Sequence, residues 1–299
     1  MRLLSVKDTA IKWELSERSI RNYCQNGRIP GAFLIGKTWS IPDDAVKPTR
    51  KVKEPESIRT LPTVLRYEKS HAITGGIYHK IQIELTYNSN HIEGSKLTHD
   101  ETRYIYETNT IGIDNKQINV DDIVETVNHF RCIDYIIDNF DKALSEKMIK
   151  TLHMILKTGT SDSRQSWFAV GDYKKLPNEV GGLETTSPEE VHGKIKQLLK
   201  KHNASVSPDL DALLDLHFQF ERIHPFQDGN GRVGRLILFK ECLRHGIVPF
   251  IITDKLKMYY YRGLSEWTYE RGYLRDTSLA AQDEMKQYLD YFRIEYVKG

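Results

Sequence analysis

The residues most plainly suited to chemistry lie in one short stretch, from His224 to Arg235, which reads His-Pro-Phe-Gln-Asp-Gly-Asn-Gly-Arg-Val-Gly-Arg. An imidazole has an ordinary pKa of about 6.5, so His224 can accept a proton at cellular pH. Asp228 is a hard oxygen ligand of the kind that holds Mg²⁺ together with substrate phosphates. The two residues indicate a site that handles a metal-bound polyphosphate beside a nucleophile that must lose its proton.

The second half of this stretch is suited to binding an anion. Gly229 and Gly231 lack a Cβ, so the backbone N–H groups around Asn230 can turn toward a phosphate. The apolar residues between 233 and 243 predict a buried helix that begins directly after these glycines. Helix N-termini favour phosphate because their first N–H groups lack helical partners and the helix dipole is positive there.

Two arginines follow the glycines. Arg232 and Arg235 are three positions apart, which puts them on one side of the first helical turn, and their planar guanidinium groups suit bidentate phosphate contacts. Asn230 can donate a hydrogen bond to an oxygen between them. A Gly-x-Gly turn or a single His is common in structural loops, but this many charged groups in one loop are costly unless they have partners. The loop therefore predicts a binding site.

The stretch resembles the Fic motif, His-x-Phe-x-(Asp/Glu)-Gly-Asn-Gly-Arg-x-x-Arg, at every defining position, and the resemblance runs from about Ser57 to the C-terminus when helix order is included. It implies a helical domain that transfers the AMP part of ATP to a Ser, Thr or Tyr hydroxyl of a protein. It also implies that His224 is the general base and that Asp228 holds Mg²⁺. The residues that it implies for ATP binding are Gly229, Asn230, Gly231, Arg232 and Arg235.

A second motif precedes this one. Ser89 and Glu93 are four positions apart in a predicted helix at about 79–94, so they share a helix face, and Gly94 is suited to end that helix. The pattern resembles the family's inhibitory-helix motif, (Ser/Thr)-x-x-x-Glu-(Gly/Asn). The resemblance implies that Glu93 pairs with Arg235 and obstructs the γ-phosphate of ATP, which makes the chain an autoinhibited transferase.

Two further resemblances concern the substrates. Residues 171–174, Gly-Asp-Tyr-Lys, are similar to the Gly-x-Tyr-Arg that opens the family's flap, a β-hairpin that aligns the target peptide by strand addition. Lys stands where Arg is usual, and the alternative is an ordinary Gly-rich loop. Tyr260 and Tyr261 resemble a Tyr-Tyr-x-x-Leu stretch near the nucleotide base, with core packing as the alternative. The residues implied for target docking are Lys174, Lys175 and Leu176.

The N-terminal residues form a different pattern. A helix ends near Trp13, a second helix has Ser16 as its N-cap and stops at residues 26–27, and two short alternating runs surround Gly36. Two helices followed by a hairpin resemble the excisionase and MerR-type winged helix-turn-helix, in which the second helix enters the major groove of DNA. The DNA contacts implied are Arg18, Ser19, Arg21, Asn22 and Lys37.

Charge agrees with a nucleic-acid partner for this segment. Residues 1–53 contain eleven Lys and Arg against five Asp and Glu, a net charge of +6, whereas the whole chain has +2. A small basic module beside a mildly acidic body is typical of nucleic-acid binding, and one such module is small enough that we expect a dimer if it reads a site. The alternative is a winged helix that contacts proteins.

Length and composition predict two unequal domains in the 299 residues: a winged helix-turn-helix domain at 1–50 and a Fic domain at 51–299, with a charged linker at 47–55. We expect no membrane contact and a cytoplasmic location, because no apolar run of about 20 residues and no signal-peptide pattern occur. The three cysteines, far apart, are expected to be reduced. The sequence contains no His-Glu-x-x-His pattern, so no zinc site is predicted. His245 is interpreted as a helix cap.

The fold class expected is mainly α, with a small winged domain and a short hairpin flap. Seven apolar residues between 123 and 137 recur at the spacing of one buried helix face. The expected helices after the linker are 79–92, 99–108, 121–139, 146–156, 188–202, 208–223, 231–244, 255–271 and 279–297. Two other functions remain open: removal of AMP with Glu93 activating water, and a regulator in which the Fic core senses nucleotide while the winged helix acts on DNA.

Overall fold

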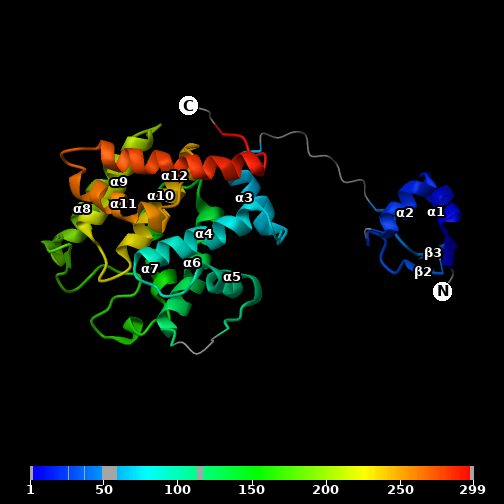
Figure 1. Ribbon diagram of the computed structural model, residues 1–299, viewed down its shortest axis with the longest axis horizontal. Helices are drawn as coiled ribbons and strands as arrows, with labels where there is room; N and C mark the ends of the chain where they lie inside the picture. Colours follow the sequence, from blue (N-terminus) through cyan, green and yellow to red (C-terminus); the bar gives the residue numbers. More distant parts are fainter. Residues whose placement is uncertain (1–2, 26, 37, 49–58, 113–116, 297–299) are drawn as a thin grey trace. The chain divides into compact units, whose positions relative to one another are not determined.

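The structure is a computed structural model that describes residues 3–25, 27–36, 38–48, 59–112 and 117–296. It divides into two compact units, Met1–Ser57 and Ile58–Gly299, and each is described by itself below (Figure 1). The domain boundary expected after residue 50 falls outside the described residues.

The first unit is a three-stranded antiparallel sheet with two helices. Its elements are β1 (Leu3–Ser5), α1 (Val6–Trp13), α2 (Glu17–Gln25), β2 (Phe33–Ile35) and β3 (Thr38–Pro42), with the strand order β1-β3-β2. The sequence predicts the start of a helix at Leu3, but Leu3–Ser5 is a strand paired with β3. Ser5 is extended and caps α1 in a reciprocal box with Asp8, so the helix cannot begin before Val6.

The two helices and the hairpin share one small core. Ile20 of α2 and Ile41 of β3 are fully buried, and Trp13 at the end of α1 packs with them. Strands β2 and β3 pair in antiparallel register, as the alternating runs around Gly36 predict. Ser16 accepts from the backbone N–H of Ser19 at 3.2 Å and therefore caps α2.

The second unit is helical. Its helices are α3 (Leu61–Ser70), α4 (Ile77–Ile92), α5 (His99–Thr108), α6 (Val120–Asn139), α7 (Glu146–Lys157), α8 (Pro188–Asn203), α9 (Leu210–Ile223), α10 (Asn230–His245), α11 (Lys257–Glu266) and α12 (Gly272–Tyr291). Short 3-10 turns lie at η1 (Asp162–Arg164) and η2 (Asp254–Leu256), and β4 (Glu179–Val180) pairs with β5 (Leu183–Glu184). Thr60, before α3, and Glu295, after α12, form an isolated parallel β-bridge.

Three stretches of this unit differ from the sequence prediction, and one is the helix expected at 255–271, where the turn η2 is followed by α11 and the helix ends at Glu266. Helix α3 was not predicted, because its short apolar pattern lies next to the charged linker. Helix α12 begins seven residues earlier than residue 279 and ends at Tyr291, not 297. The hydroxyls of Thr277 and Ser278 donate to carbonyls one turn back, at 2.7 and 2.8 Å, so these polar residues can face the core within the helix.

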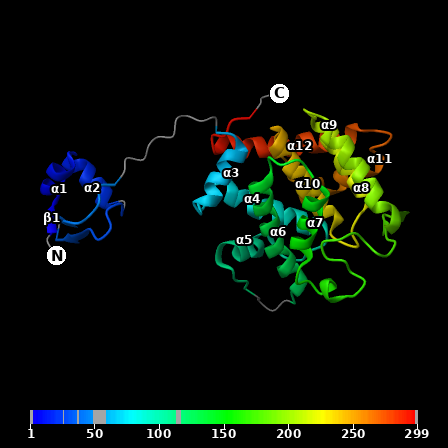
Figure 2. The same ribbon diagram turned by 180° about the vertical axis from the view of Figure 1, so that it is seen from behind.

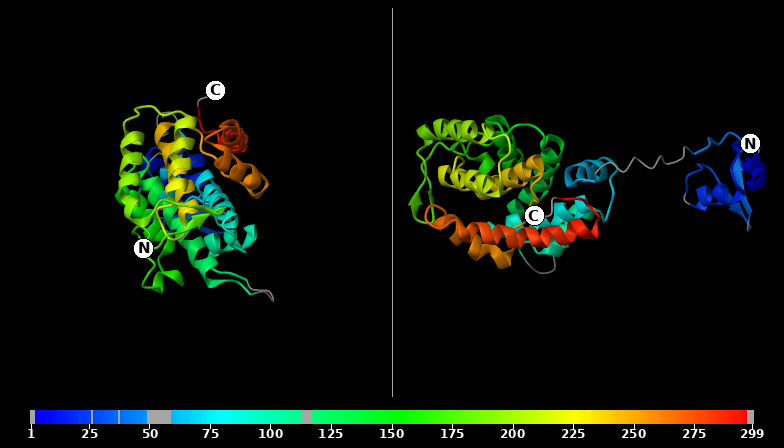
Figure 3. Two further views of the ribbon diagram at one scale, coloured as in Figure 1. Left: turned by 90° about the vertical axis from the view of Figure 1, so that its left-hand side faces the viewer. Right: turned by 90° about the horizontal axis from the view of Figure 1, so that it is seen from above.

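Helix α10 lies at the centre of the helical unit. It packs against α9, α6, α7 and α4, and Figures 2 and 3 show it enclosed by the other helices while α12 runs along one side of the unit. Nearly every residue of α10 is buried, including Leu236 and Phe239 in the main core. The buried residues of α10 also include charged ones, Arg232, Arg235, Lys240 and Glu241, so each of these needs a partner within the unit. The N-terminal end of α10 carries the glycines of the predicted phosphate loop.

Among the residues that the structure describes, none of the helices has both the length and the apolar character needed to cross a membrane.

Candidate active site

The loop between α9 and α10 is held by its own side chains. His224 follows the last residue of α9 with a left-handed backbone (φ 50°), which ends the helix. Asn230 is 2% exposed, and its side-chain amide accepts from the N–H of Phe226 and donates to its carbonyl, both at 2.8 Å. In this conformation the Asn230 amide closes the loop, and its contact with an anion between the arginines stays a prediction.

His153 of α7 also fixes this loop, and sequence reasoning missed it. Its Nε2 donates to the carbonyl of Asp228 at 3.2 Å, and its Nδ1 accepts from the N–H of Gly171 at 3.0 Å. The ring stacks on Phe226 with centroids 3.9 Å apart. Burial, with the nearby charge of Lys157, lowers the pKa of His153 to about 3, so the neutral ring makes both bonds. No spacing signal in the sequence links His153 to residues more than 70 positions later.

His224 presents one nitrogen to the site. Its Nδ1 lies 3.2 Å from the carbonyl of Glu221, and because a carbonyl only accepts, Nδ1 carries the proton. The basic lone pair is therefore on Nε2. Burial lowers the pKa of His224 to about 4, with a further decrease from the charge of Lys174. The imidazole is thus neutral at pH 7, as a general base must be, although it is a weaker base than a free histidine.

Asp228 lies in a network of buried charges. Its Oδ2 contacts Lys157 Nζ at 2.6 Å and Arg232 Nη2 at 3.2 Å. Glu125 of α6 contacts the same two cations, at 2.5 Å from Lys157 and in a direct pair with Arg232. Burial alone would raise the pKa of Asp228, but the charges of Arg232 and Lys157 lower it to about 2. No local spacing links Lys157 and Glu125 to this site, because they lie 71 and 107 positions from the residues they contact.

The Asp228 carboxylate keeps access to solvent within this network. Its side chain is 48% exposed, whereas Lys157 and Arg232 are almost fully buried. A single ionised carboxylate with an accessible oxygen fits the way Mg²⁺ is bound beside phosphates. Arg232 is already engaged by two carboxylates, so a phosphate would have to compete with them or use the Arg232 Nε, which has no partner among the described residues.

The second arginine is held by the residues of the second motif. Arg235 Nη2 contacts Glu93 Oε1 at 2.7 Å, and Arg235 also donates to the hydroxyl of Ser89 at 3.0 Å and to its carbonyl at 2.9 Å. Glu93 itself is the C-cap of α4, and Gly94, the residue expected to cap the helix, follows at the next position with φ 98°. A Cβ at Gly231 would collide with Glu93 Oε1, so the glycine is what lets this carboxylate lie over the start of α10.

A cavity of about 620 Å³ opens beside these residues, a volume within the range of small-ligand sites. Its polar lining includes Glu93, His224 and Arg235, and Phe218 and Leu264 supply apolar surface. Two predicted residues also line it: Tyr260, which is 2% exposed and bonded to His217 Nε2 at 2.7 Å, and Tyr261, which is 40% exposed. Gly229 and the Arg232 side chain are not part of this lining.

Glu221 lines the same cavity and was not predicted. Burial raises its pKa to about 8, so the neutral acid prevails at pH 7. Its Oε1 has no hydrogen-bond partner in the described part of the chain. A Cβ at Gly234 would collide with this oxygen and crowd the ring of His217, so Gly234 gives Glu221 room between α9 and α10.

The flap region contains a hairpin. Strands β4 and β5 are joined by Gly181 and Gly182, both with positive φ, which is the two-residue turn typical of tight hairpins. Val180 and Thr185 line the cavity from this side. The hairpin begins five residues after Lys174, where the predicted flap motif ends.

Lys174 itself does not face outward. It is 3% exposed, and its ammonium donates to Asn178 Oδ1 at 2.7 Å and to Thr185 Oγ1 at 2.5 Å. Burial lowers its pKa to about 8. In this conformation the Lys174 side chain holds the base of the hairpin, and its role in docking a target stays a prediction. Lys175 and Leu176 are exposed, and their docking role stays a prediction.

The predicted DNA contacts lie on α2. Arg18, Arg21 and Asn22 are exposed, and Ser19 is half-buried. Arg21 forms a surface ion pair with Glu17 at 2.7 Å. Lys37 lies outside the described residues.

Comparisons with known proteins agree with the motif. Residues 143–241 match the model of the Fic/DOC family. Protein adenylyltransferase Fic of Drosophila virilis is 28% identical over 211 residues, which cover 68% of this chain and 39% of that protein. The protein of the same name from Drosophila ananassae is 29% identical over 209 residues, which cover 67% of this chain and 38% of that protein. The chain thus spans about two-fifths of the length of these relatives.

Solved structures give the same fold. A Fic domain containing signaling protein from Bacteroides thetaiotaomicron is 25% identical with a TM-score of 0.58, and the match covers 77% of this chain and 90% of that one. Fic-1 from C. elegans is 21% identical with a TM-score of 0.60, and the match covers 77% of this chain and 69% of that one. At this identity the second likeness shows the fold alone.

The buried histidines predict how stability depends on pH. Burial lowers the pKa of His217 to about 3, below the value of about 6.5 expected in the unfolded chain. As pH falls below 6.5 the unfolded state binds this proton first, so the free energy of unfolding decreases; above 6.5 neither state binds it. In His217→Asn, the decrease between pH 6.5 and 4.5 should be shallower by about 1.4 kcal/mol per pH unit. Urea titrations at several pH values measure this slope, and His71→Asn, at an exposed position, should keep the wild-type slope.

Proposed function

We propose that this chain, which carries a Fic domain at residues 143–241, is a protein adenylyltransferase whose resting state is inhibited by Glu93. The substrates would be ATP and a protein with a modifiable Ser, Thr or Tyr hydroxyl, which includes the chain itself. The names of the relatives and the polar cavity beside His224 and Arg235 support this proposal.

The reaction is an in-line displacement at the α-phosphorus of ATP. The target oxygen forms the new P–O bond, His224 Nε2 accepts the hydroxyl proton, and pyrophosphate leaves with the electrons of the broken P–O bond. Asp228 would hold Mg²⁺, which shields the charge of the phosphates when bound. Gly231 at the start of α10 and Arg235 line the same cavity, and the N–H groups of this helix start, together with the Arg235 guanidinium, would bind the leaving phosphates.

The observation that carries the inhibition is the contact of Arg235 with Glu93 and Ser89. This guanidinium is 6% exposed and has a carboxylate, a hydroxyl and a carbonyl as partners. A γ-phosphate that needs Arg235 must displace Glu93 or bind in a shifted position. A shift of about 1 Å from the productive geometry can cost on the order of 10²-fold in rate. ATP therefore binds without reacting efficiently while Glu93 stays in place.

Removing the Glu93 carboxylate should switch transfer on. Glu93→Gly frees Arg235 for phosphate, and we expect self-modification to rise by about 10²-fold when intact mass is measured after incubation with Mg-ATP. Glu93→Gln keeps the size and removes the charge, so it should also activate. Ser89→Ala should raise self-modification by less than Glu93→Gly does, because the Glu93 carboxylate remains. Adding His224→Ala to the active variant should lower transfer by roughly 10²–10⁴-fold with ATP still bound.

The same experiment separates the alternative enzyme. If wild type and Glu93→Gly gain AMP equally, the inhibitory role of Glu93 is wrong. If wild type instead strips AMP from protein that was modified by Glu93→Gly, and the variant cannot, then Glu93 activates water for removal of AMP. If no form transfers AMP while nucleotide alters DNA binding, the chain is a nucleotide-sensing regulator.

The charge network predicts the behaviour of the metal. In the Glu93→Gly background, Asp228→Ala should abolish both activity and Mg²⁺ dependence. Lys157→Met removes the cation that lies 2.6 Å from Asp228 Oδ2, so half-maximal activity should need less Mg²⁺ than in the parent. Mg²⁺ titrations of initial rate decide this. Lys150→Met, on the same helix but paired with Glu146 and Asp172, should leave the Mg²⁺ requirement unchanged.

We further propose that the N-terminal unit binds DNA and, if it reads a site, does so as a dimer. The exposed Arg18 and Arg21 on α2 and the net charge of +6 over residues 1–53 support it. Fluorescence anisotropy of the full chain with duplex DNA should give an affinity that falls steeply with salt, as counterion release requires. Arg18→Gln should weaken binding and flatten that salt dependence. Absence of salt-sensitive binding would leave the unit as a protein-docking module.

A further inference from the structure

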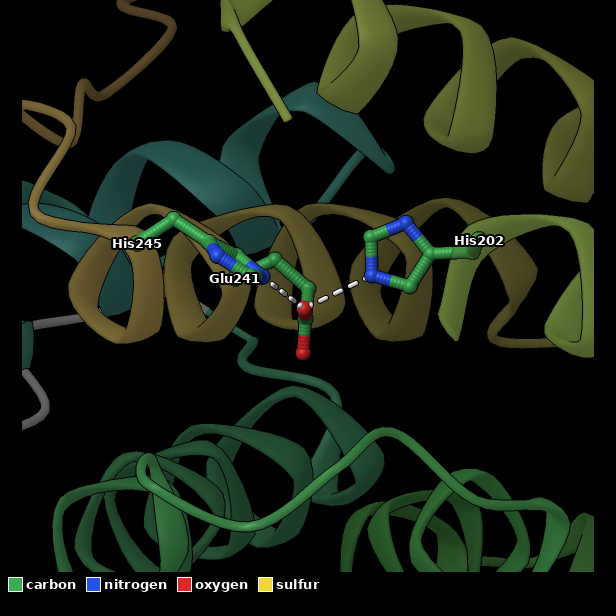
Figure 4. A group of neighbouring side chains, drawn as sticks. All are labelled: His202, Glu241 and His245. Atoms are coloured by element: carbon green, nitrogen blue, oxygen red, sulfur yellow. Dashed lines mark hydrogen bonds and ion pairs between the residues drawn. The ribbon is translucent and has the colours of Figure 1, made fainter. Parts of the chain in front are cut away.

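A second cluster of polar side chains lies at the end of α10 opposite to the Fic motif loop. Figure 4 shows His202 of α8 facing Glu241 and His245 of α10. One nitrogen from each histidine and one carboxylate oxygen all lie within 4.8 Å of one another. The sequence spacing gave no hint of this group, because His202 is nearly forty positions from Glu241 and only the fold joins them.

The ligand atoms are almost at the separations of a metal site. His202 Nε2 lies 2.7 Å and His245 Nε2 lies 3.2 Å from the same oxygen, Glu241 Oε2. Ligands at about 2.1 Å from a tetrahedral Zn²⁺ are about 3.4 Å apart. Shifts of a few tenths of an ångström in the three side chains would therefore open room for the ion.

One nitrogen of the cluster has no hydrogen bond. His245 Nε2 is shielded from solvent and lies close to Glu241 Oε2, yet its geometry does not make a hydrogen bond with that oxygen. An unpaired buried ring nitrogen is costly in a packed interior. A metal beside Oε2 would use the lone pair of this nitrogen and that of His202 Nε2 together.

The second oxygen of Glu241 is already fixed. Lys240 pairs with Oε1 and also donates to the carbonyl of Lys142 at 2.5 Å. This contact leaves Oε2 as the oxygen nearest the two histidines and holds the carboxylate in one orientation, as outer partners of metal ligands commonly do. Side-chain exposure is 5% at His202, 0% at Glu241 and 12% at His245, so the group is preorganised by burial.

We propose that His202, Glu241 and His245 bind a Zn²⁺ ion. Two imidazoles and one carboxylate are a ligand set that zinc takes, with water as the fourth ligand. His202 also lines a cavity of about 430 Å³ with Lys201 and Asp215, which gives the ion access from the His202 side. The site is structural in effect: it fastens α8 to the C-terminal end of the helix that carries Arg232 and Arg235.

Two cations compete with the ion. Lys240 is buried against Glu241, and Arg244 Nη1 lies 3.6 Å from Glu241 Oε2 with 24% exposure. Zinc must displace Arg244 from that oxygen, and its partial exposure lets it move into solvent. The proposal therefore predicts that Arg244→Gln binds zinc more tightly than wild type, a result that a purely structural ion network does not produce.

The test measures metal binding by the full chain without an affinity tag. Chelator-treated protein is titrated with Zn²⁺ against a chromogenic competitor, and Co²⁺ is used as a second probe because tetrahedral sites give visible absorption bands. Wild type should bind one Zn²⁺ with a rise in Tm. His245→Gln and Glu241→Gln should weaken binding by more than about 100-fold, beyond what loss of an outer partner costs. Arg244→Gln should tighten it.

His192→Gln is the matched control, since His192 is on the same helix α8 with a side chain that is 64% exposed. It should bind zinc as wild type does. Stoichiometric binding that survives in His245→Gln would place the ion elsewhere and overturn the proposal. So would the absence of zinc binding in both wild type and Arg244→Gln, and these two proteins keep the test decisive if the ligand variants fail to fold. Adenylyl transfer is not a readout here.

Discussion

The need of two buried guanidinium groups for partners organises the helical unit. Arg232 and Arg235 extend from a helix that is enclosed on all sides, and they are 5% and 6% exposed. Removing a charge from water costs several kcal/mol unless paired groups replace the solvent. Glu125 and Asp228 serve the first arginine, and Ser89 and Glu93 serve the second. Helices α4 and α6 are thereby joined to α10 by charge as well as by apolar packing.

The proposed inhibition by Glu93 follows from the same need of a buried guanidinium for a partner. Without nucleotide, Arg235 needs an anion, and the end of α4 supplies one in Glu93. A phosphate would also satisfy this guanidinium, so the nucleotide and the Glu93 carboxylate would compete for the one buried charge of Arg235. The first arginine differs, because Lys157 adds a second cation to its carboxylates and the group is close to neutral in itself. A phosphate near Arg232 would meet charges that already balance one another. The stronger competition between phosphate and carboxylate is therefore expected at Arg235.

Small residues decide how closely the acids approach α10. Gly231 admits Glu93 and Gly234 admits Glu221, each at a place where a Cβ would collide with the carboxyl. Glu221, kept neutral by burial, adds a proton donor to the cavity that contains His224 and Arg235. His153 fixes the loop from the other side through bonds to Asp228 and Gly171. The site is thus held by α7, α9 and α10 together, and not by the motif loop alone.

The sequence by itself determined the local features: the helix before and after the loop, the turn at the glycines, and the face shared by Ser89 and Glu93. These depend on residues a few positions apart, whose geometry follows from helix and turn periodicity. The tertiary structure decided the pairs that join distant segments. Lys157 with Asp228, His153 with Gly171 and His202 with Glu241 follow from how helices pack, which no local spacing encodes. It also decided how deeply Asn230 and Lys174 are buried, at 2% and 3% exposure, although the hydrogen-bond partners of both side chains lie nearby in the sequence.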